Sequence, residues 1–432
     1  MTRGACPRAS RSGAPPVVYA VMTPALLAAI MLLAQGLQQP RPVLPAGTAI
    51  PIRFPESIES GREPVGATVR LQTTSPLAAG GCTVVPAFSS IAATLVVSRP
   101  ARSFGRRGRL ELRFDSLATA GHGWARLGAV LDSLEWAARG TLTTEGELIE
   151  KPRTLRGVVG TAGAAGLAGA ATGVGVVPVF VLTGVNLVLR GGQAHILAGQ
   201  RGRLRLTAPL ELPAAPRCEP AVNPWESAAV PAVPALPPHA TDKSGAKSAD
   251  PINLLFRGTA AELNAAFAQA GWTAAQRSTI GALAVETEAI VLQRSDTAAP
   301  MSHEYYLGRV ENLRYERASL SARARHHVRL WRADGSDTLW AAAATEDVGL
   351  LVSARRGAVT HRIAADIDRE RDLLVGDLLA GGCVALEGYA TLPGAKSAGT
   401  SVAGQPFVTD ASVAVLRVLE CRPRGVEPGP SR

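Results

Sequence analysis

The chain has 432 residues, of which 47% are hydrophobic and 19% are charged. This length suits two or three domains, and the composition excludes a wholly disordered chain. The net charge of +10 lies in residues 1–250, because residues 251–421 carry a net −2 and residues 422–432 a net +2. A basic half suggests nucleic acid or an anionic membrane as partner. No nucleic-acid motif or aromatic-interleaved basic patch accompanies it, so we expect a membrane and no nucleic acid.

The N-terminus has the pattern of a targeting segment. Three arginines precede the charge-free residues 12–40, whose apolar centre is residues 17–34 and is followed by small residues. This order is typical of a secretory signal peptide. We therefore predict that residues 1–36 are a signal peptide or, alternatively, a retained membrane anchor, with the start at Met1 or Met22. Either leads to export, to the periplasm or the membrane-associated cell envelope.

Export changes the expected state of the cysteines. Four lie beyond the signal: Cys82, Cys218, Cys383 and Cys421. An even number in an oxidising compartment favours two disulfides. Pairing within domains, Cys82 with Cys218 and Cys383 with Cys421, is the simpler arrangement, and four buried thiols are the alternative.

Residues 43–215 read as a β-barrel-like module. Short runs with apolar residues at alternate positions recur every 10–20 residues with Gly or Pro between them, which is typical of a small barrel or sandwich. The strands that we expect are at residues 50–54, 68–73, 82–86, 91–98, 109–115, 124–131 and 203–207. In the run 109–115, Leu110, Leu112 and Phe114 should point inward.

A glycine-rich apolar segment, residues 157–189, interrupts this module without a single charge. We predict a helical hairpin there. Small residues at four-residue spacing would share one helix face and permit close helix packing in a membrane or between copies of the chain. These membrane-contact candidates are Gly157, Thr161, Ala165, Gly169 and Gly173. A packing hairpin buried in a soluble oligomer is the alternative.

The proline-rich residues 216–250 are predicted to be a semi-rigid disordered linker.

Residues 251–421 are predicted to be an α+β domain, and residues 422–432 a disordered tail. Thr259 and Glu262 form a capping box that should open a helix ending at Gly271. The chain is thus predicted to be mixed, with an all-β barrel-like module followed by an α+β domain. Other elements expected in that domain are a hairpin of residues 325–332 and 339–345, a strand at 359–363 and a helix from the acidic run at 366–370 to Gly381-Gly382.

Two resemblances to known families follow from longer motifs. The order of "PAGT" before an "IP" strand, "VPAFSSI", "RLELRFDSL", a hydrophobic insertion and "AGQRGRLRL" resembles the barrel domain of TrbI-type conjugation and secretion-channel proteins. In that family a helical insertion meets the outer membrane. Here the insertion is glycine-rich and lacks clear amphipathicity, so the resemblance implies an envelope-facing β-module rather than a channel.

A denser set of motifs lies in the C-terminal half. "DPINLLFRGTAAELNAAFAQAGW", "RHHVRLW", "THRIAADIDRERDLLVGDLLAGG" and "PFVTD" occur in this order within residues 250–421 and resemble the LssY C-terminal domain family. That domain often follows membrane-spanning modules, and its own activity is not established. The resemblance therefore implies an envelope context and no particular reaction. The chain departs from the family at Ala364-Ala365, where Asp-Pro is usual.

The polar candidates for chemistry cluster in this domain. His326 and His327 are neighbours in an expected strand, so they point to opposite faces and cannot jointly chelate one metal. His326 shares its face with apolar residues. His327 shares the other with Arg325 and Arg329, the anion-binding candidates. The catalytic candidates are His327, His361, Asp347 and Asp410, with Asp377 as a further possible partner.

These residue types fit three interpretations. They form an anion-binding or hydrolytic site, a metal site of His327, His361 and an aspartate, or paired charges that brace the fold. Thr409 or Ser302 as a nucleophile lacks an identifiable base. The sequence leaves both the cofactor and the metal unknown.

The favoured function is a membrane-linked binding or scaffolding protein of the envelope, with membrane lipid or envelope proteins as partners and self-association through the glycine-rich segment. The alternative is an envelope hydrolase that acts on a phosphorylated lipid or glycan. Whether the protein is an enzyme stays open at this point.

Overall fold

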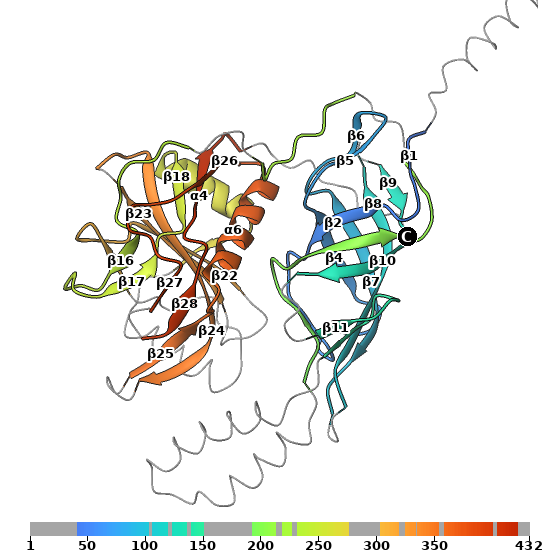
Figure 1. The fold of residues 1–432 in the computed structure, drawn as a ribbon, viewed down its shortest axis with the longest axis horizontal. Coiled ribbons are helices and arrows are strands. Elements are labelled where there is room, and N and C mark those ends of the chain that lie inside the picture. Colours follow the sequence, from blue (N-terminus) through green and yellow to red (C-terminus); the bar gives the residue numbers. More distant parts are fainter. Residues whose placement is uncertain are drawn as a thin grey trace, which may run out of the picture. The chain divides into compact units, whose positions relative to one another are not determined.

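The N-terminal half forms a nine-stranded sheet that curls into a barrel-like form (Figure 1). Its strand order is β10-β14-β2-β4-β7-β8-β12-β11, with β9 paired to β8, and β10 also contacts β8 and β11, so the two ends of the sheet approach one another. The strands are β2 (Ala49–Arg53), β4 (Thr68–Thr73), β7 (Ser90–Arg99), β8 (Arg109–Ala118), β9 (Trp124–Arg126), β10 (Ala129–Leu134), β11 (Gly140–Leu142), β12 (Leu148–Glu150) and β14 (Arg201–Leu206).

This is a computed structural model, and it describes residues 41–102, 106–119, 123–135, 140–150, 192–212, 218–226, 231–275, 303–318, 325–333, 335–353, 358–400 and 404–421. For residue 318 and residues 349–353 and 358–361 it describes the backbone alone. The predicted signal segment 1–36, the glycine-rich insertion 157–189 and the tail 422–432 lie outside these ranges. Residues Pro42–Arg432 form one unit.

Alternation of apolar and polar residues explains this sheet. In β8, Leu110 and Phe114 are buried as expected, whereas Leu112 is only partly buried. A register shift beside Leu95 in the pairing of β7 with β8 accompanies this difference. The expected strand at 124–131 is divided into β9 and β10, with Gly128 between them. The predicted barrel-like sheet is confirmed.

Three short pairs of strands flank this sheet: β1 (Val43–Leu44) with β15 (Leu210–Glu211), β3 (Ile58–Glu59) with β13 (His195–Ile196), and β5 (Leu77–Ala79) with β6 (Cys82–Val85).

A second, eight-stranded sheet occupies the C-terminal half, with the order β19-β22-β23-β24-β18-β29-β26 and β25 paired to β24. Among the described strands of this sheet, only β18 and β29 pair in parallel. The strands are β18 (Leu254–Arg257), β19 (Thr273–Ala274), β22 (Leu313–Ala318), β23 (Arg325–Arg332), β24 (Leu339–Ser353), β25 (Ala358–Ile363), β26 (Val384–Ala390) and β29 (Val413–Val418).

Two helices, α4 (Ala260–Gln269) and α6 (Ile367–Gly381), occur in the described ranges, and both pack on one face of the second sheet (Figure 1). The Thr259 side chain caps α4 in the predicted capping box. Asp366 caps α6, and Gly382 ends it in the left-handed conformation. The capping signals thus located both helices to within one or two residues. Strands nevertheless dominate the described chain.

A small four-stranded sheet covers the opposite face, where its residues share a core with Leu255, Trp331 and Val415. Its order is β17 (Ser248–Pro251), β16 (His239–Thr241), β20 (Tyr305–Tyr306) and β21 (Arg309–Val310). β16 and all but the last residue of β17 fall in residues 216–250, which the sequence assigned to a disordered linker. That assignment overlooked ordered structure, because proline composition says nothing of pairing with a distant strand such as β20. The last pair is β27 (Ala398–Thr400) with β28 (Pro406–Val408).

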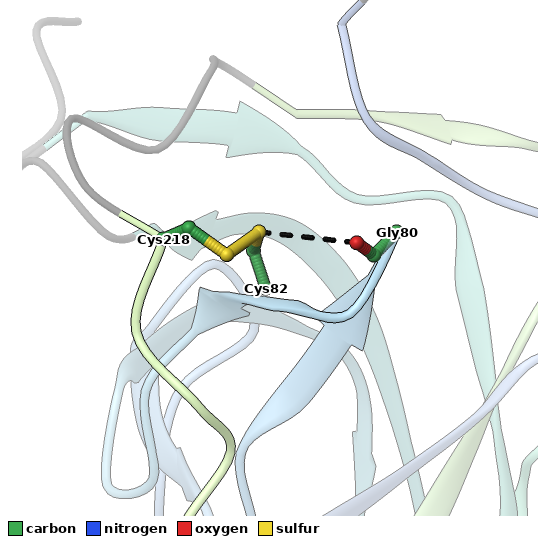
Figure 2. The surroundings of a disulfide bond; sticks show 3 residues. All are labelled: Gly80, Cys82 and Cys218. Carbon is green, nitrogen blue, oxygen red and sulfur yellow. Dashed lines mark hydrogen bonds between the residues drawn. A yellow bond between two sulfur atoms is a disulfide. The ribbon is translucent and has the colours of Figure 1, made fainter.

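Both predicted disulfides are present. Cys82 bonds to Cys218, as Figure 2 shows, and Cys383 bonds to Cys421. The first ties the chain that leaves the barrel-like sheet back to β6. The second ties the chain after β29 to the end of α6. Within the described ranges, no helix has both the length and the apolar character needed to cross a bilayer.

We predict that Phe267→Ala destabilises the protein by about 3–5 kcal/mol, the usual cost of removing a buried ring. The Phe267 ring stacks on Tyr315 with centroids 3.9 Å apart and meets the edge of Trp272. The measurement is urea unfolding of the purified chain. Val65→Ala is the control, since its side chain is 63% exposed and should change stability by less than about 0.5 kcal/mol. Equal effects of the two changes would contradict this account of the core.

Candidate functional site

The candidate site is built on β23, where successive side chains point to opposite faces of the sheet. Arg325, His327 and Arg329 share the face toward the small sheet. His326 shares the helix-covered face with the buried Val328. The sequence predicted this division. It did not predict that both faces of the sheet would be covered. Because they are covered, both histidines are buried.

On the face toward the small sheet, Asp347 joins two of the candidates. Arg325 Nε donates to Asp347 Oδ2 at 3.0 Å, and His327 Nε2 lies 3.2 Å from Asp347 Oδ1. Asp347 is the residue of β24 opposite Arg325 in the ladder. Cross-strand register therefore places this carboxylate between the guanidinium and the imidazole.

Arg329 extends the network to the small sheet. Its Nη1 donates to Asp250 Oδ2 in β17 at 3.0 Å and lies 3.8 Å from Glu304 Oε1. The Thr345 hydroxyl donates to the same Asp250 oxygen at 3.3 Å and lies 3.3 Å from the His327 ring nitrogens. Hydrogen bonds thus run continuously from Asp347 through His327 and Thr345 to Asp250.

Burial determines the charge states in this network. It lowers the pKa of His327, an effect that Asp347 offsets only in part and that Arg329 and Arg325 reinforce. Burial and the neighbouring Asp250 raise the pKa of Glu304 to about 8, against the opposing charge of Arg329. At neutral pH the imidazole is therefore uncharged, and Glu304 carries a proton beside the Asp250 carboxylate.

His326 has the opposite character. Its Nδ1 lies 2.8 Å from Glu370 Oε2 on α6, and Glu346, whose carboxylate accepts from Arg369 Nη2 at 3.1 Å, lies nearby. Burial lowers the pKa of His326, but the charges of Glu370 and Glu346 outweigh it, so the pKa is raised. The pKa values of the adjacent histidines are thus shifted in opposite directions, because burial prevails over Asp347 at His327 whereas Glu370 and Glu346 prevail over burial at His326.

Among the remaining candidates whose side chains the structure describes, Asp410 and Thr409 do not join His327. Asp410 is bound by Arg371 of α6, whose Nη1 and Nη2 donate to its two oxygens at 2.8 and 3.0 Å. The Thr409 hydroxyl donates to Asp368. His361 lies in β25 opposite Leu350, with its side chain outside what the structure describes.

Neither a nucleophile nor a metal centre emerges from these placements. Ser302 lies outside the described residues. In the described parts of the chain, no three His, Cys, Asp or Glu side chains are arranged to hold a metal ion. What the geometry does provide is a set of paired charges that joins the small sheet and α6 to the two faces of β23.

Asp377, which the sequence suggested only as a possible partner, lies in a second polar centre. Its carboxylate accepts from Arg53 Nη1 at 2.8 Å, from Trp272 Nε1 at 3.0 Å and from Arg317. Arg53 belongs to β2 of the barrel-like sheet, and Asp377 to α6. Arg53 is also held by Gln72, which accepts from its Nε and Nη2. We call this group of residues the junction.

The junction explains a glycine inside α6. A Cβ on Gly376 would lie 2.8 Å from Arg53 Nη1 and 3.2 Å from Cη2 of Trp225, so only glycine fits there without displacement. This centre was not predicted from the sequence. One signal in the sequence could have found it. Residues 373–379 lie in an expected helix and are apolar except at Asp377. A helix that is apolar all round is covered on all sides, so the Asp377 carboxylate should be buried with a partner.

Residues 230–413 match the family described as LssY C-terminus. The resemblance that the C-terminal motifs predicted is therefore confirmed. None of the curated proteins matches the chain. Among solved structures, ComB10 of the Com type IV secretion system of Helicobacter pylori is similar to 41% of this chain and 92% of its own, with 15% sequence identity and a TM-score of 0.23. A score this low carries no argument about the fold or role of this chain.

The two histidines predict opposite dependences of stability on pH. The pKa of His327 is lowered on folding, so its contribution is present above about pH 6.5 and is lost as the pH falls. The pKa of His326 is raised, so its contribution is present below about pH 6.5 and is lost as the pH rises through the raised value.

We therefore expect His327→Gln to flatten the loss of stability on acidification and His326→Gln to flatten the loss on alkalinisation. Unfolding free energies measured from pH 5 to 9 test this, and each variant is the other's control. The same change of slope in both variants would refute the assignment.

We predict that Asp377→Asn costs about 3–5 kcal/mol, because it leaves the buried Arg53 and the half-buried Arg317 without this counter-charge. Asp132→Asn is the matched control: Asp132 pairs with Arg205 at 3.0 Å, with both side chains more than 40% exposed, and should cost no more than about 1 kcal/mol. Urea unfolding measures both, and a small effect at Asp377 would show that the junction contributes little.

Proposed function

We propose that the protein is an exported binding or scaffolding protein of the cell envelope, and that the His, Arg and Asp residues of its C-terminal half hold the fold together. One observation carries the proposal. Arg325, His327, Arg329 and Asp347 are covered on their face of the sheet, and each satisfies another buried group. A hydrolytic site would instead require a reactive group that substrate can reach.

Three further points support the envelope setting. Two disulfides are typical of proteins in oxidising compartments. The N-terminal sequence has the order of a secretory signal. The LssY C-terminal resemblance implies a membrane context. We also infer that residues 251–421 are an α+β domain, which α4 and α6 on one face of the second sheet support.

The partners that we propose are membrane lipid or envelope proteins, without nucleic acid. The glycine-rich residues 157–189 would make the membrane contact or associate with a second copy, since small residues at four-residue spacing permit close helix packing. The C-terminal half would then be the rigid part that the barrel-like module presents to the envelope.

The decisive experiment compares turnover with stability in the full-length protein. We expect the wild type to hydrolyse p-nitrophenyl phosphate, or phosphatidic acid in vesicles, no faster than Arg329→Gln does. That variant should lose about 3–5 kcal/mol of unfolding free energy, because Asp250 then lacks its buried cation.

His361→Gln is the matched variant for turnover. If hydrolysis is present in the wild type and is lost in His361→Gln at unchanged stability, the hydrolase alternative is right and the proposal is wrong. Flotation measures the binding of both variants to vesicles. Binding without turnover is the result that the scaffolding role predicts.

Export is tested separately with acid-quenched cells and a thiol-reactive mass label. We expect the full chain in the envelope fraction with Cys82, Cys218, Cys383 and Cys421 unlabelled until a reductant is added. A cytosolic protein with four labelled thiols would contradict the proposed compartment.

A further inference from the structure

We propose that the Cys82–Cys218 disulfide is a redox-sensitive clamp: it holds Trp225 in the junction, and its reduction by an external dithiol loosens the contact between α6 and the barrel-like sheet. The proposal concerns regulation of the fold and does not depend on the function proposed above. It rests on the accessibility of one disulfide and on the contacts of the segment that follows it, residues 218–226, which we call the strap.

The two disulfides differ in exposure. Cys218 is exposed and Cys82 is half-buried, at the tip of the β5–β6 hairpin (Figure 2). In the other disulfide neither cysteine is exposed: Cys383 is completely buried in the second core, and Cys421 is half-buried against it. Thiol–disulfide exchange requires a thiolate to reach a sulfur atom, so a reductant meets Cys82–Cys218 first.

The strap is attached to the barrel-like sheet at both ends. At its start, beside the disulfide, Thr83 N donates to the Glu219 carbonyl at 2.9 Å. Near its end, Trp225 Nε1 donates to the Thr74 carbonyl at 3.0 Å. The disulfide thus fixes the point from which the chain reaches the Trp225 site.

Trp225 contacts both halves of the protein. From the barrel-like sheet, the Arg201 guanidinium lies 4.2 Å from the indole centroid, and the Phe88 ring centroid is 6.1 Å away. From the C-terminal half, Trp225 packs against the second core, beside Gly376 of α6. The indole therefore fills space between β14 and α6 next to the Arg53–Asp377 pair.

Chain connectivity sets the size of the effect. With the disulfide closed, six residues lie between Trp225 and its anchor at Cys218. With it open, the preceding anchor in the described part of the chain is Leu212, whose N–H is bonded to the Pro42 carbonyl, and twelve residues lie between it and Trp225. Doubling the length of a loop lowers the effective concentration of its end by about threefold. Loss of the Thr83–Glu219 bond would add to this.

The chemistry balances with a dithiol as the reductant. One thiolate of the dithiol attacks a sulfur of the Cys82–Cys218 bond and forms a mixed disulfide, releasing the other cysteine as a thiolate that takes up a proton. The second thiolate of the dithiol then displaces the remaining cysteine. The protein gains two electrons and two protons, and the dithiol becomes a cyclic disulfide.

The test uses the intact chain and a titration with dithiothreitol. Mass labelling of thiols reports which cysteines open, hydrogen exchange follows the strap and α6, and acrylamide quenching follows Trp225 by difference from Trp225→Phe. We expect Cys82 and Cys218 to be labelled first, with exchange in residues 218–226 about threefold faster or more, higher exchange in α6, stronger Trp225 quenching and unchanged exchange in β23.

Variants separate the clamp from general destabilisation. The double variant Cys82→Ser/Cys218→Ser should reproduce these changes without reductant, and Trp225→Ala should abolish the further effect of reductant on α6. Cys383→Ser/Cys421→Ser is the matched control and should leave the strap unchanged. Earlier labelling of Cys383 and Cys421, or unchanged exchange in α6 once Cys82 and Cys218 are labelled, would overturn the proposal.

Discussion

The contact on which the rest of the structure depends is that of the Asp377 carboxylate with Arg53 and Arg317. A carboxylate removed from water is costly unless donors replace its hydration, and here two guanidinium groups and the Trp272 indole do so. These donors come from different parts of the chain. Asp377 lacks Arg53 until β2 lies against α6, and Arg53, once buried there, would lack its counter-charge without Asp377. Neither half is therefore complete alone, and Gly376 is the local adaptation that lets them approach.

The polar network around β23 applies the same principle to strand register. Because side chains alternate, a shift of one residue would turn Arg325, His327 and Arg329 toward α6 and His326 toward the small sheet. Arg329 would then lose Asp250, and His326 would lose Glu370. Buried ion pairs contribute little net stability compared with apolar packing, but mispairing them is expensive. The network therefore selects one register among those that the apolar residues of β22, β23 and β24 would allow.

Local signals made much of the fold predictable. Alternation identified the main strands of the barrel-like sheet, and the capping residues Thr259 and Asp366 located both described helices. What failed was information held in long-range pairing. β16 pairs with β20, some 60 residues away, and a proline-rich composition cannot reveal that. For the site, alternation placed His326 and His327 on opposite faces. It could not show that the small sheet covers His327, or that Arg53 meets Asp377 across 324 residues.

A His, Arg and Asp set that resembles a hydrolytic site can thus arise from a purely structural need. Both uses require charged groups within hydrogen-bonding distance, and both shift pKa values, so neither composition nor a perturbed pKa separates them. Access does. At β23 the shifts of His327 and Glu304 follow from burial between two sheets, and the proton that Glu304 keeps reduces the charge beside Asp250. Groups in this arrangement neutralise one another, whereas a catalytic group must keep one bond free for its substrate.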